Sequence, residues 1–408
     1  MNQYIKSYII YLLTLLTLLI VFNWAVDPYG VHSHNIVPLE KKPAAQTHVR
    51  LSKPYLVTQI KPQTIILGSS RAAVGLNPDN PNFIHLPVFN MGIDGANMRE
   101  IYYNFLHAYQ VGNLKQVILA LDFMSFNIHM EDKPDFSLKR LKTKKNKIAY
   151  ETEMFSQYTS YQATKDSIKT LLNKFDPTLP VMNKSGLTLE DSLHTYQKIH
   201  GGHHNTTLIS EKSYVNDVWL PPKVRGYNFN DESKSESTPI YLGKILSLCY
   251  EKNIKVTMFF SPTHIRHRVL ISKIGLWDIY QNWKKKVIQE NYTQAKQHSK
   301  QPYEIWDFTI INTMTTETFP AQGDANYKMT WYWESSHYKQ QLGNLILDKI
   351  LGQYNTDEVK VTIGKLVDIY NIDIQLNIEG KEYDKFILDN KDITTELSEL
   401  IKNKYELS

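Results

Sequence analysis

The sequence has a single cysteine, Cys249, among its 408 residues. One thiol cannot build an intramolecular disulfide framework, and it supplies no cysteine-based zinc site. The chain also has no internal repeat and no low-complexity tract. A glycine-rich phosphate loop is missing too, because Gly68-Ser69-Ser70 lacks the lysine and the spacing of a P-loop. We therefore expect no cofactor.

A strong excess of one charge is also missing. The formal net charge is +5, and the content of 42% hydrophobic and 21% charged residues is that of an ordinary globular chain. No basic stripe is interleaved with aromatic residues, which argues against nucleic-acid binding. Residues 355–408 carry twelve acidic residues and seven lysines. The rest of the chain is therefore more basic than the average, which favours an anionic envelope surface or glycan as a partner.

One long apolar run is present, near the amino terminus. Residues 8–26 carry no charge, and a helix of this length approaches the roughly 30 Å of a bilayer core. Lys6 precedes the run, Trp24 lies where an aromatic belt forms, and Asp27-Pro28 ends it. A cleaved signal peptide is the rival interpretation, but residues 22–26 offer no small-x-small cleavage site. We expect a membrane anchor over residues 1–27.

Beyond the anchor, short apolar runs alternate with longer amphipathic stretches. This pattern is typical of a parallel sheet with helices on both faces. We expect a linker over residues 28–60 and an α/β domain over residues 61–354. The expected strands are residues 64–67, 88–90, 117–121, 256–260 and 304–308. Ligands of such sheets bind beyond the carboxyl ends of the strands.

Two stretches interrupt or follow this alternation. Residues from about 128 to 235 are too many for one crossover and rich in charge and tyrosine, so we expect a mainly helical insertion. Its basic run, residues 139–147, is more typical of a solvated face than of a binding patch. Residues 355–408 are expected to form a small acidic appendix. In it, an apolar run at 372–378 precedes a turn at Glu379-Gly380 and a final helix near 393–401.

A candidate nucleophile follows the first expected strand. A catalytic serine needs a base, an acid that orients the base, and donors for the oxyanion, and it must protrude at a turn. Gly68 is a small residue at the strand exit, and Ser70 begins the next helix, whose amino terminus favours negative charge. A serine at a helix start is also a common N-cap, so this feature alone leaves both roles open.

The far end of the chain supplies a base and an acid. Glu334 precedes His337 by three residues, just before the last helix of the expected domain. This spacing can place a carboxylate and an imidazole side by side on one loop. Histidine is suited to take the serine proton, and the glutamate would hold its tautomer and stabilise the imidazolium. The predicted catalytic residues are therefore Ser70, His337 and Glu334.

In these residues the chain resembles the SGNH/GDSL hydrolases, and among them the membrane-anchored DltD-like type. The family's first block, Gly-Asp-Ser, is matched by Gly68-Ser69-Ser70, with serine in the middle as in the membrane-anchored relatives. Its second block is matched by residues 90–95, and its Asp-x-x-His block by residues 334–337, with glutamate for aspartate. The third block, Gly-x-Asn-Asp, is not present, and residues 121–125 occupy its place. The resemblance spans residues 62 to about 352.

The resemblance implies a flavodoxin-like three-layer α/β/α fold with five parallel strands. It implies that the backbone of Gly95 and Ser70 would bind the oxyanion, whereas the missing third block removes a side-chain amide donor. It also implies a single-pass protein of the inner (cytoplasmic) membrane whose catalytic domain lies outside the cytoplasm, with a multi-span membrane acyltransferase as partner. The implied reaction is ester hydrolysis or O-acyl transfer on an envelope glycan, a lipid or a carried acyl group.

Other polar residues are candidates for binding. We expect Arg71 and Asp122 to contact substrate, and His264, at the end of the fourth expected strand, either contacts substrate or is bonded within its loop. The histidine-rich segment 200–204 invites comparison with a metal site. No carboxylate or cysteine lies at a familiar ligand spacing, so a polar loop is favoured and no metal is expected.

Two other assignments compete with a serine enzyme of this type. An α/β-hydrolase is disfavoured, because the serine follows the first expected strand and the acid adjoins the histidine. The alternative function is a non-catalytic scaffold in polysaccharide or lipid modification or export. The missing third block and the glutamate in place of aspartate favour that alternative.

Overall fold

The computed structural model describes residues 3–32, 34, 36–141, 147–221, 224–231, 236–324, 326–352 and 363–405. The strands are β1 (Thr64–Leu67), β2 (Val88–Asn90), β3 (Gln116–Leu121), β4 (Asn230–Asp231), β5 (Glu236–Ser237), β6 (Lys255–Phe260), β7 (Glu304–Asp307) and β8 (Lys365–Val367). The α-helices are α1 (Gln3–Val26), α2 (Pro43–Thr47), α3 (Val49–Ile60), α4 (Ser70–Gly75), α5 (Met98–Val111), α6 (Lys147–Thr159), α7 (Tyr161–Leu172), α8 (Asp191–Ile199), α9 (Gly202–Ser213), α10 (Thr238–Lys252), α11 (Ile265–Lys273), α12 (Trp277–Gln297), α13 (Gln340–Ile350), α14 (Ile372–Asp389) and α15 (Lys391–Tyr405). Short 3₁₀ helices are η1 (Leu39–Lys41), η2 (Phe123–Phe126) and η3 (Leu138–Arg140), and η4 (Tyr214–Trp219) is a π-helix.

A mostly parallel sheet forms the centre of the molecule. Its strand order is β2-β1-β3-β6-β7-β8, with every pair parallel except β7 and β8. The parallel strands are the expected ones, and their order is the doubly wound order 2-1-3-4-5 of flavodoxin-like folds. The expectation of five strands is corrected by β8, a short antiparallel edge strand from the segment beyond residue 354.

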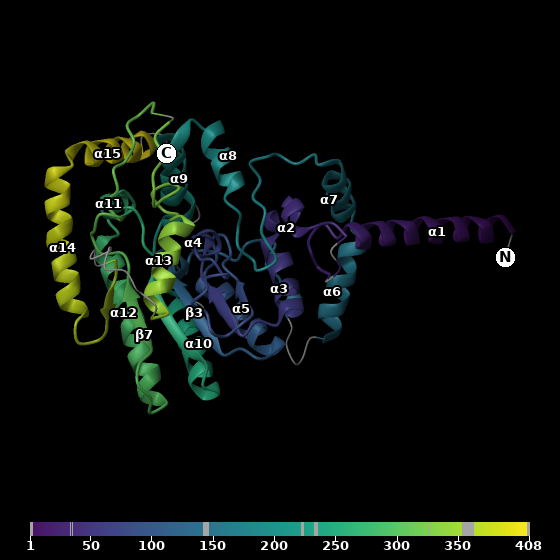
Figure 1. Ribbon diagram of the computed structural model, residues 1–408, viewed down its shortest axis with the longest axis horizontal. Helices are drawn as coiled ribbons and strands as arrows, with labels where there is room; N and C mark the ends of the chain where they lie inside the picture. The colour runs from purple at the N-terminus through teal and green to yellow at the C-terminus, as the bar shows by residue number, and fades with distance from the viewer. Residues whose placement is uncertain are drawn as a thin grey trace.

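Both faces of the sheet are buried, which explains why its strands are continuous apolar runs. In β3 the side chains at 117, 119 and 121 belong to one core cluster, and those at 118 and 120 to the other. The first cluster includes side chains of α3, α5, α10 and α12, and the second includes side chains of α4 and α13. Figure 1 shows the strands between these helices. The chain is therefore a layered α/β protein.

Two segments differ from the sequence-based expectation. Residues 43–60, expected within a linker, form α2 and α3, and α3 is buried along most of its length. The expected turn at Glu379-Gly380 lies inside α14 instead, because buried Ile372, Leu376 and Tyr383 follow a helical period against the main core. The expected domain boundary at residue 354 lies outside the described residues, as do residues 142–146 of the basic run.

The helix α1 leaves the body at one end and is long and apolar enough to span a membrane. Figure 1 shows it projecting away from the sheet, with α6 and α7 beside its base. The stretch expected as an insertion contains α6 to α9. Its first helices, α6 and α7, lie beside the base of α1, whereas α8 and α9 lie near α4 (Figure 1). The insertion thus reaches from the base of α1 to the carboxyl ends of the strands.

Candidate active site

The serine lies where β1 passes into α4. Gly68 is required at the strand exit, because a Cβ there would lie 2.9 Å from the Cβ of Ala72 and 3.0 Å from that of Ala120. Ser69 is the N-cap of α4, and its hydroxyl accepts a hydrogen bond from the Arg71 amide. Capping is therefore done by Ser69. This leaves Ser70, the first residue of the helix, free to present its hydroxyl elsewhere.

Glu334 and His337 lie in one tight turn before α13. The amide of Trp333 donates to the carbonyl of His337 over 2.8 Å, and Tyr332 bridges to Tyr338 in antiparallel fashion. Inside the turn, the Glu334 carboxylate accepts the amides of Ser336 and His337, each over 2.8 Å. The spacing of three residues thus places acid and imidazole side by side, as the sequence predicted.

The three predicted catalytic side chains are in contact. Ser70 Oγ lies 2.7 Å from His337 Nε2, and His337 Nδ1 is hydrogen-bonded to Glu334 Oε1. The carboxylate accepts a hydrogen bond from Nδ1–H, so Nε2 of the neutral ring carries no proton and can accept the proton of the serine. The arrangement is that of an acid, a base and a nucleophile in series.

The acid of this series is ionised at any physiological pH. Burial alone would raise the pKa of Glu334, but the neighbouring His337 ring and the hydrogen bonds to the carboxylate lower it to about 2. A fixed negative charge beside Nδ1 stabilises an imidazolium when His337 takes a proton.

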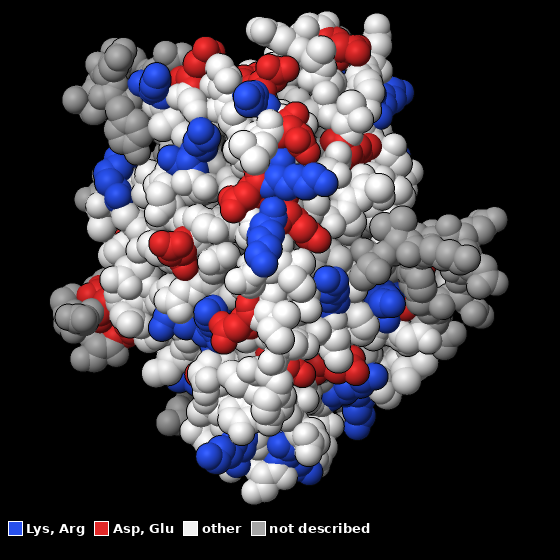
Figure 2. All heavy atoms as spheres, turned by 90° about the vertical axis from the view of Figure 1, so that its left-hand side faces the viewer, with Lys and Arg blue, Asp and Glu red and all other residues white. Residues whose placement is uncertain are grey.

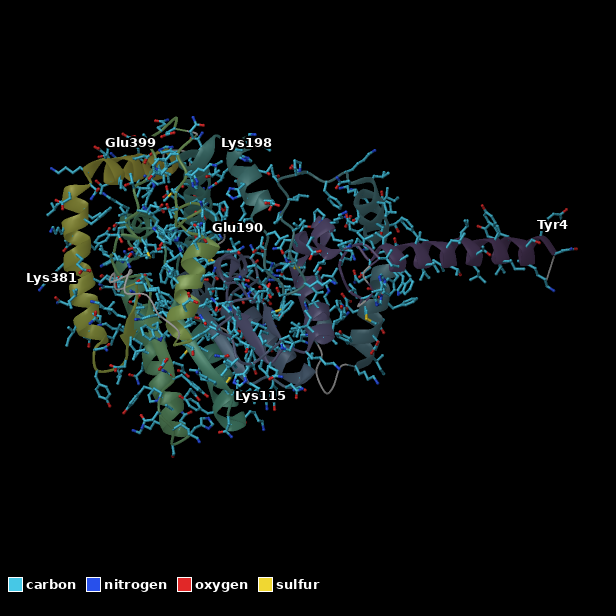
Figure 3. The ribbon with its side chains drawn as sticks, in the orientation of Figure 1. Tyr4, Lys115, Glu190, Lys198, Lys381 and Glu399 are labelled. Carbon is cyan, nitrogen blue, oxygen red and sulfur yellow. The ribbon has the colours of Figure 1, made fainter. Side chains whose placement is uncertain are left out.

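A cavity of about 470 Å³ opens beside the serine. Ser70, Glu334 and His337 line one side, and side chains of α8 and α9 line the other. Its apolar wall includes Val74, Leu193, Ile209 and Trp333. Figure 3 labels Glu190 and Lys198 at the two ends of α8. Lys115, which precedes β3 and so marks the amino end of that strand, lies well away from both (Figure 3). The insertion therefore covers the site at the carboxyl ends of the strands.

Arg71 and Asp122, expected to contact substrate, face the protein interior instead. Asp122 accepts hydrogen bonds from Arg71 Nη1 over 2.9 Å and from the Ser69 hydroxyl, and its side chain is 0% exposed. Arg71 Nε donates to Ser336 Oγ over 3.0 Å, and Nη2 lies 2.9 Å from His267 Nε2. Arg71 thus joins the helix of the serine to the turn of the histidine.

Buried aromatic and imidazole groups complete this cluster. Ser336 Oγ donates to the Tyr214 hydroxyl over 2.6 Å, and the Tyr214 ring lies 5.7 Å from the Arg71 guanidinium. Burial and the adjacent Arg71 lower the pKa of His267, so its neutral ring can accept a hydrogen bond from the guanidinium of Arg71. Through these contacts the cluster holds the helix of Ser70 and the turn of His337 at a fixed distance from each other.

The loop after β2 carries the predicted oxyanion donor, Gly95, which adopts a positive φ of 62°. The preceding residue, Asp94, lines the cavity with Ser70. Gly92 lies against α4, where a Cβ would come within 2.4 Å of the Ala73 amide. The loop therefore runs directly beside the helix of the serine. The donation by the Gly95 and Ser70 amides to an oxyanion stays a prediction.

The helix α3 holds this loop with two buried basic side chains. Lys53 Nζ donates to the carbonyls of Asn90 and Gly92 over 2.9 and 2.6 Å. Burial lowers the pKa of Lys53 to about 7, and a neutral amine has two N–H groups for these two carbonyls. Arg50 Nη2 donates to the Asp94 carbonyl over 2.7 Å and pairs with Glu100.

The remaining histidine candidates are engaged within the protein. His264 caps α11 through Nδ1, its Nε2 lies 2.7 Å from the Glu317 carbonyl, and it is 1% exposed. Burial lowers the pKa of His264 to about 4. It therefore does not reach substrate, and its amide instead donates to the Ser335 carbonyl. The segment 200–204, expected as a polar loop, instead places its buried His203 and His204 in the first turn of α9. His203 Nδ1 lies 3.0 Å from the Trp333 carbonyl, and His204 pairs with Glu396. Within the described ranges, no three His, Cys, Asp or Glu residues group as metal ligands would.

Sequence reasoning missed the supporting residues Arg50, Lys53, Tyr214 and His267. None of them has a spacing that ties it to the serine, because each reaches the site through the fold. A weak signal existed in α3, where Val49, Lys53, Leu56 and Val57 recur at helical spacing.

Comparison with known proteins found no matching family model and no matching curated sequence.

Proposed function

We propose that the protein is a membrane-anchored serine esterase or O-acyltransferase of the SGNH type. The observation that carries the proposal is the series Ser70, His337 and Glu334 at the mouth of a cavity, with Ser70 Oγ 2.7 Å from His337 Nε2. The strand order 2-1-3-4-5 and the position of the serine directly after β1 support the same family assignment.

In the proposed reaction, Ser70 Oγ attacks the carbonyl carbon of an ester while His337 Nε2 takes the serine proton. The C–O bond to the leaving alcohol then breaks as His337 returns the proton to that oxygen, which leaves an acyl-serine. Water or a second hydroxyl attacks the acyl-serine by the reverse sequence of proton transfers. The outcome is hydrolysis with water and acyl transfer with a sugar hydroxyl.

The lining of the cavity favours a neutral acyl group. Among its lining residues the charged side chains are the acids Asp94 and Glu334, and no lysine or arginine lies there to bind an anion. The apolar wall from α8 and α9 suits the hydrocarbon part of an acyl chain. We propose an acylated envelope glycan or lipid as the substrate and the outer side of the inner membrane as the location.

A scaffold with the same fold and no activity is the second candidate. Its specific support is Asp122, which occupies the place of the missing third block. The carboxylate of Asp122 accepts hydrogen bonds from Arg71 and Ser69, within the protein interior. Gln46 and Gln197 are the amide side chains among the residues that line the cavity, and the Gln197 amide is bonded to His203 and to the Trp333 carbonyl. An oxyanion in this site would therefore depend on backbone donors or on Gln46.

The two candidates are separated by reaction with a fluorophosphonate and by hydrolysis of a chromogenic acetate. If the protein is an enzyme, the fluorophosphonate should label it and it should hydrolyse the acetate, and both labelling and hydrolysis should vanish in Ser70→Ala. A scaffold shows neither signal above the Ser70→Ala background. The full chain in detergent or nanodiscs is the appropriate sample, because α1 is packed against α6 and α7.

A further inference from the structure

The base of α1 is fixed to the body by a buried polar contact. Asn23, near the end of α1, is 0% exposed, and its Nδ2 donates to the Tyr158 carbonyl over 2.8 Å and to Thr164 Oγ1 over 2.9 Å. Tyr158 belongs to α6 and Thr164 to α7. The two helices therefore hold α1 in one orientation, and they lie where α1 leaves the body (Figure 1).

The helix α7 has its polar and apolar faces reversed relative to a helix on a water-exposed surface. It buries Asp166, Ser167 and Thr170, and Asp166 Oδ2 accepts the Tyr29 hydroxyl over 2.9 Å. It exposes the large apolar side chains of Tyr161, Ile168, Leu171 and Leu172, which are 83, 47, 57 and 56% exposed. In water an amphipathic helix turns its apolar face inward, so the outer face of α7 needs another environment.

The position of α7 along α1 identifies that environment. A helix of 24 residues is about 36 Å long, and about 20 residues cross the hydrocarbon core, so Asn23 lies near the boundary of the bilayer. Thr164 touches Asn23, which puts the first turns of α7 at the same level. Tyr161 is of the type that gathers at this boundary. Lys165 and Lys174 are exposed between and after the apolar residues.

We propose that the outer face of α7 lies in the interfacial region of the membrane, with its apolar side chains among the acyl chains and its lysines at anionic lipid headgroups. Such a helix binds by buried apolar area together with electrostatic attraction. The proposal rests on α1 spanning the membrane and is independent of the enzymatic activity.

The opposite end of the molecule offers an internal comparison. Figure 2 shows that face, on which acidic and basic side chains are interspersed. Figure 3 labels Lys381 and Glu399 there, far from Tyr4 on α1. Leu388, in the last turn of α14, is 69% exposed, and Leu172 is 56% exposed at the end of α7. The two leucines are matched in residue type and exposure and differ in their distance from the membrane.

The test places a fluorescent NBD label on Leu172→Cys, Ile168→Cys or Leu388→Cys in the full chain, reconstituted in nanodiscs. Cys249 is fully buried, and the unaltered chain reports any labelling of it. We expect blue-shifted emission, quenching by doxyl lipids and about threefold less quenching by aqueous iodide at 168 and 172 than at 388. Anionic nanodiscs should enlarge this difference relative to zwitterionic ones.

Equal iodide quenching at 172 and 388, with no quenching by doxyl lipids, would overturn the proposal. Equal results in anionic and zwitterionic nanodiscs would overturn the role of the lysines. If the labels were exposed in nanodiscs and protected only in native membranes, the face would bind a membrane protein and the lipid assignment would be wrong.

Discussion

Two adjacent serines at the start of α4 differ in what their hydroxyls reach. Ser69 is fully buried, caps the helix and donates to Asp122, which is held by Arg71. Ser70 faces the cavity and contacts His337, which is held by Glu334. Each serine thus has an acid behind it, but a titratable base connects only Ser70 to its acid. Both serine hydroxyls are hydrogen-bonded, so what distinguishes Ser70 from Ser69 is a neighbour that can take its proton.

The largest expected effect separates the two serines directly. Ser70→Ala should lower ester hydrolysis by at least about 10³-fold, with the melting temperature nearly unchanged. Ser69→Ala should keep most of the activity and lose about 1 kcal/mol of stability, because it removes an N-cap and a buried hydrogen bond. Adding His337→Ala to Ser70→Ala should cost little more, because the residues act as a unit. Rates on a chromogenic acetate and thermal melts measure both effects, and an essential Ser69 would reverse the comparison.

The second effect separates the two acids. Glu334→Gln should lower kcat by orders of magnitude, because it removes the charge beside the imidazolium, while Glu334→Asp should keep substantial activity. Because the pKa of Glu334 is about 2, the charge is present above that pH, and acidification to pH 4 does not remove it. Glu317→Gln is the matched control, since Glu317 also accepts backbone amides nearby, at Trp331, without touching His337. Full activity in Glu334→Gln would leave a Ser-His dyad.

The third effect concerns the buried ion pair. Arg71→Met leaves Asp122 buried without its partner, which should cost about 3–5 kcal/mol of stability. Arg99→Met, which breaks the half-exposed pair with Asp132, should cost at most about 1 kcal/mol. Denaturant melts of both variants give the comparison. Similar small losses would show that Arg71 is not the link between α4 and the histidine turn.

The smallest effect is a pH dependence from Lys53. Its pKa is lowered to about 7 in the fold and is near 10.4 in the unfolded chain, so between these values the unfolded state binds more protons. Stability should therefore rise with pH through this window, by about 2 kcal/mol from pH 7.5 to 9.5. Lys53→Met should lack this rise, while the exposed Lys115→Met should keep it. Identical pH slopes in all three proteins would contradict a neutral Lys53.

The parts of the fold that could be predicted are those in which burial dictates composition. The strand β3 is apolar at every position from residue 117 to 121 because both faces of the sheet are covered, and these residues appear in the sequence as an unbroken apolar run. The strand β8 has three residues at an edge, with Leu366 46% exposed, and carries too little pattern to be recognised. In α14, the exposed Ile374 and Ile378 alternate with buried Ile372 and Leu376 as in a strand, which hid the helical period.

The candidate site shows the same division. Glu334 and His337 are close in sequence and share a turn, so their spacing was informative. Arg71 adjoins the serine in sequence, but its partners Asp122, His267 and Ser336 come from three other segments. Nothing local distinguishes a cation that binds substrate from one that ties elements together. The buried basic residues of α3 were missed for the same reason, and Pro54, inside that helix, is a residue type that disfavours helix interiors.

The proposed function depends above all on Ser70 being the activated serine. The most direct measurement is to treat the full chain with a fluorophosphonate, digest it, and locate the adduct by tandem mass spectrometry. We expect one adduct on Ser70, which should be absent in Ser70→Ala and should form much more slowly in His337→Ala. An adduct on Ser69, or no adduct on either serine while a control serine hydrolase labels under the same conditions, would contradict it.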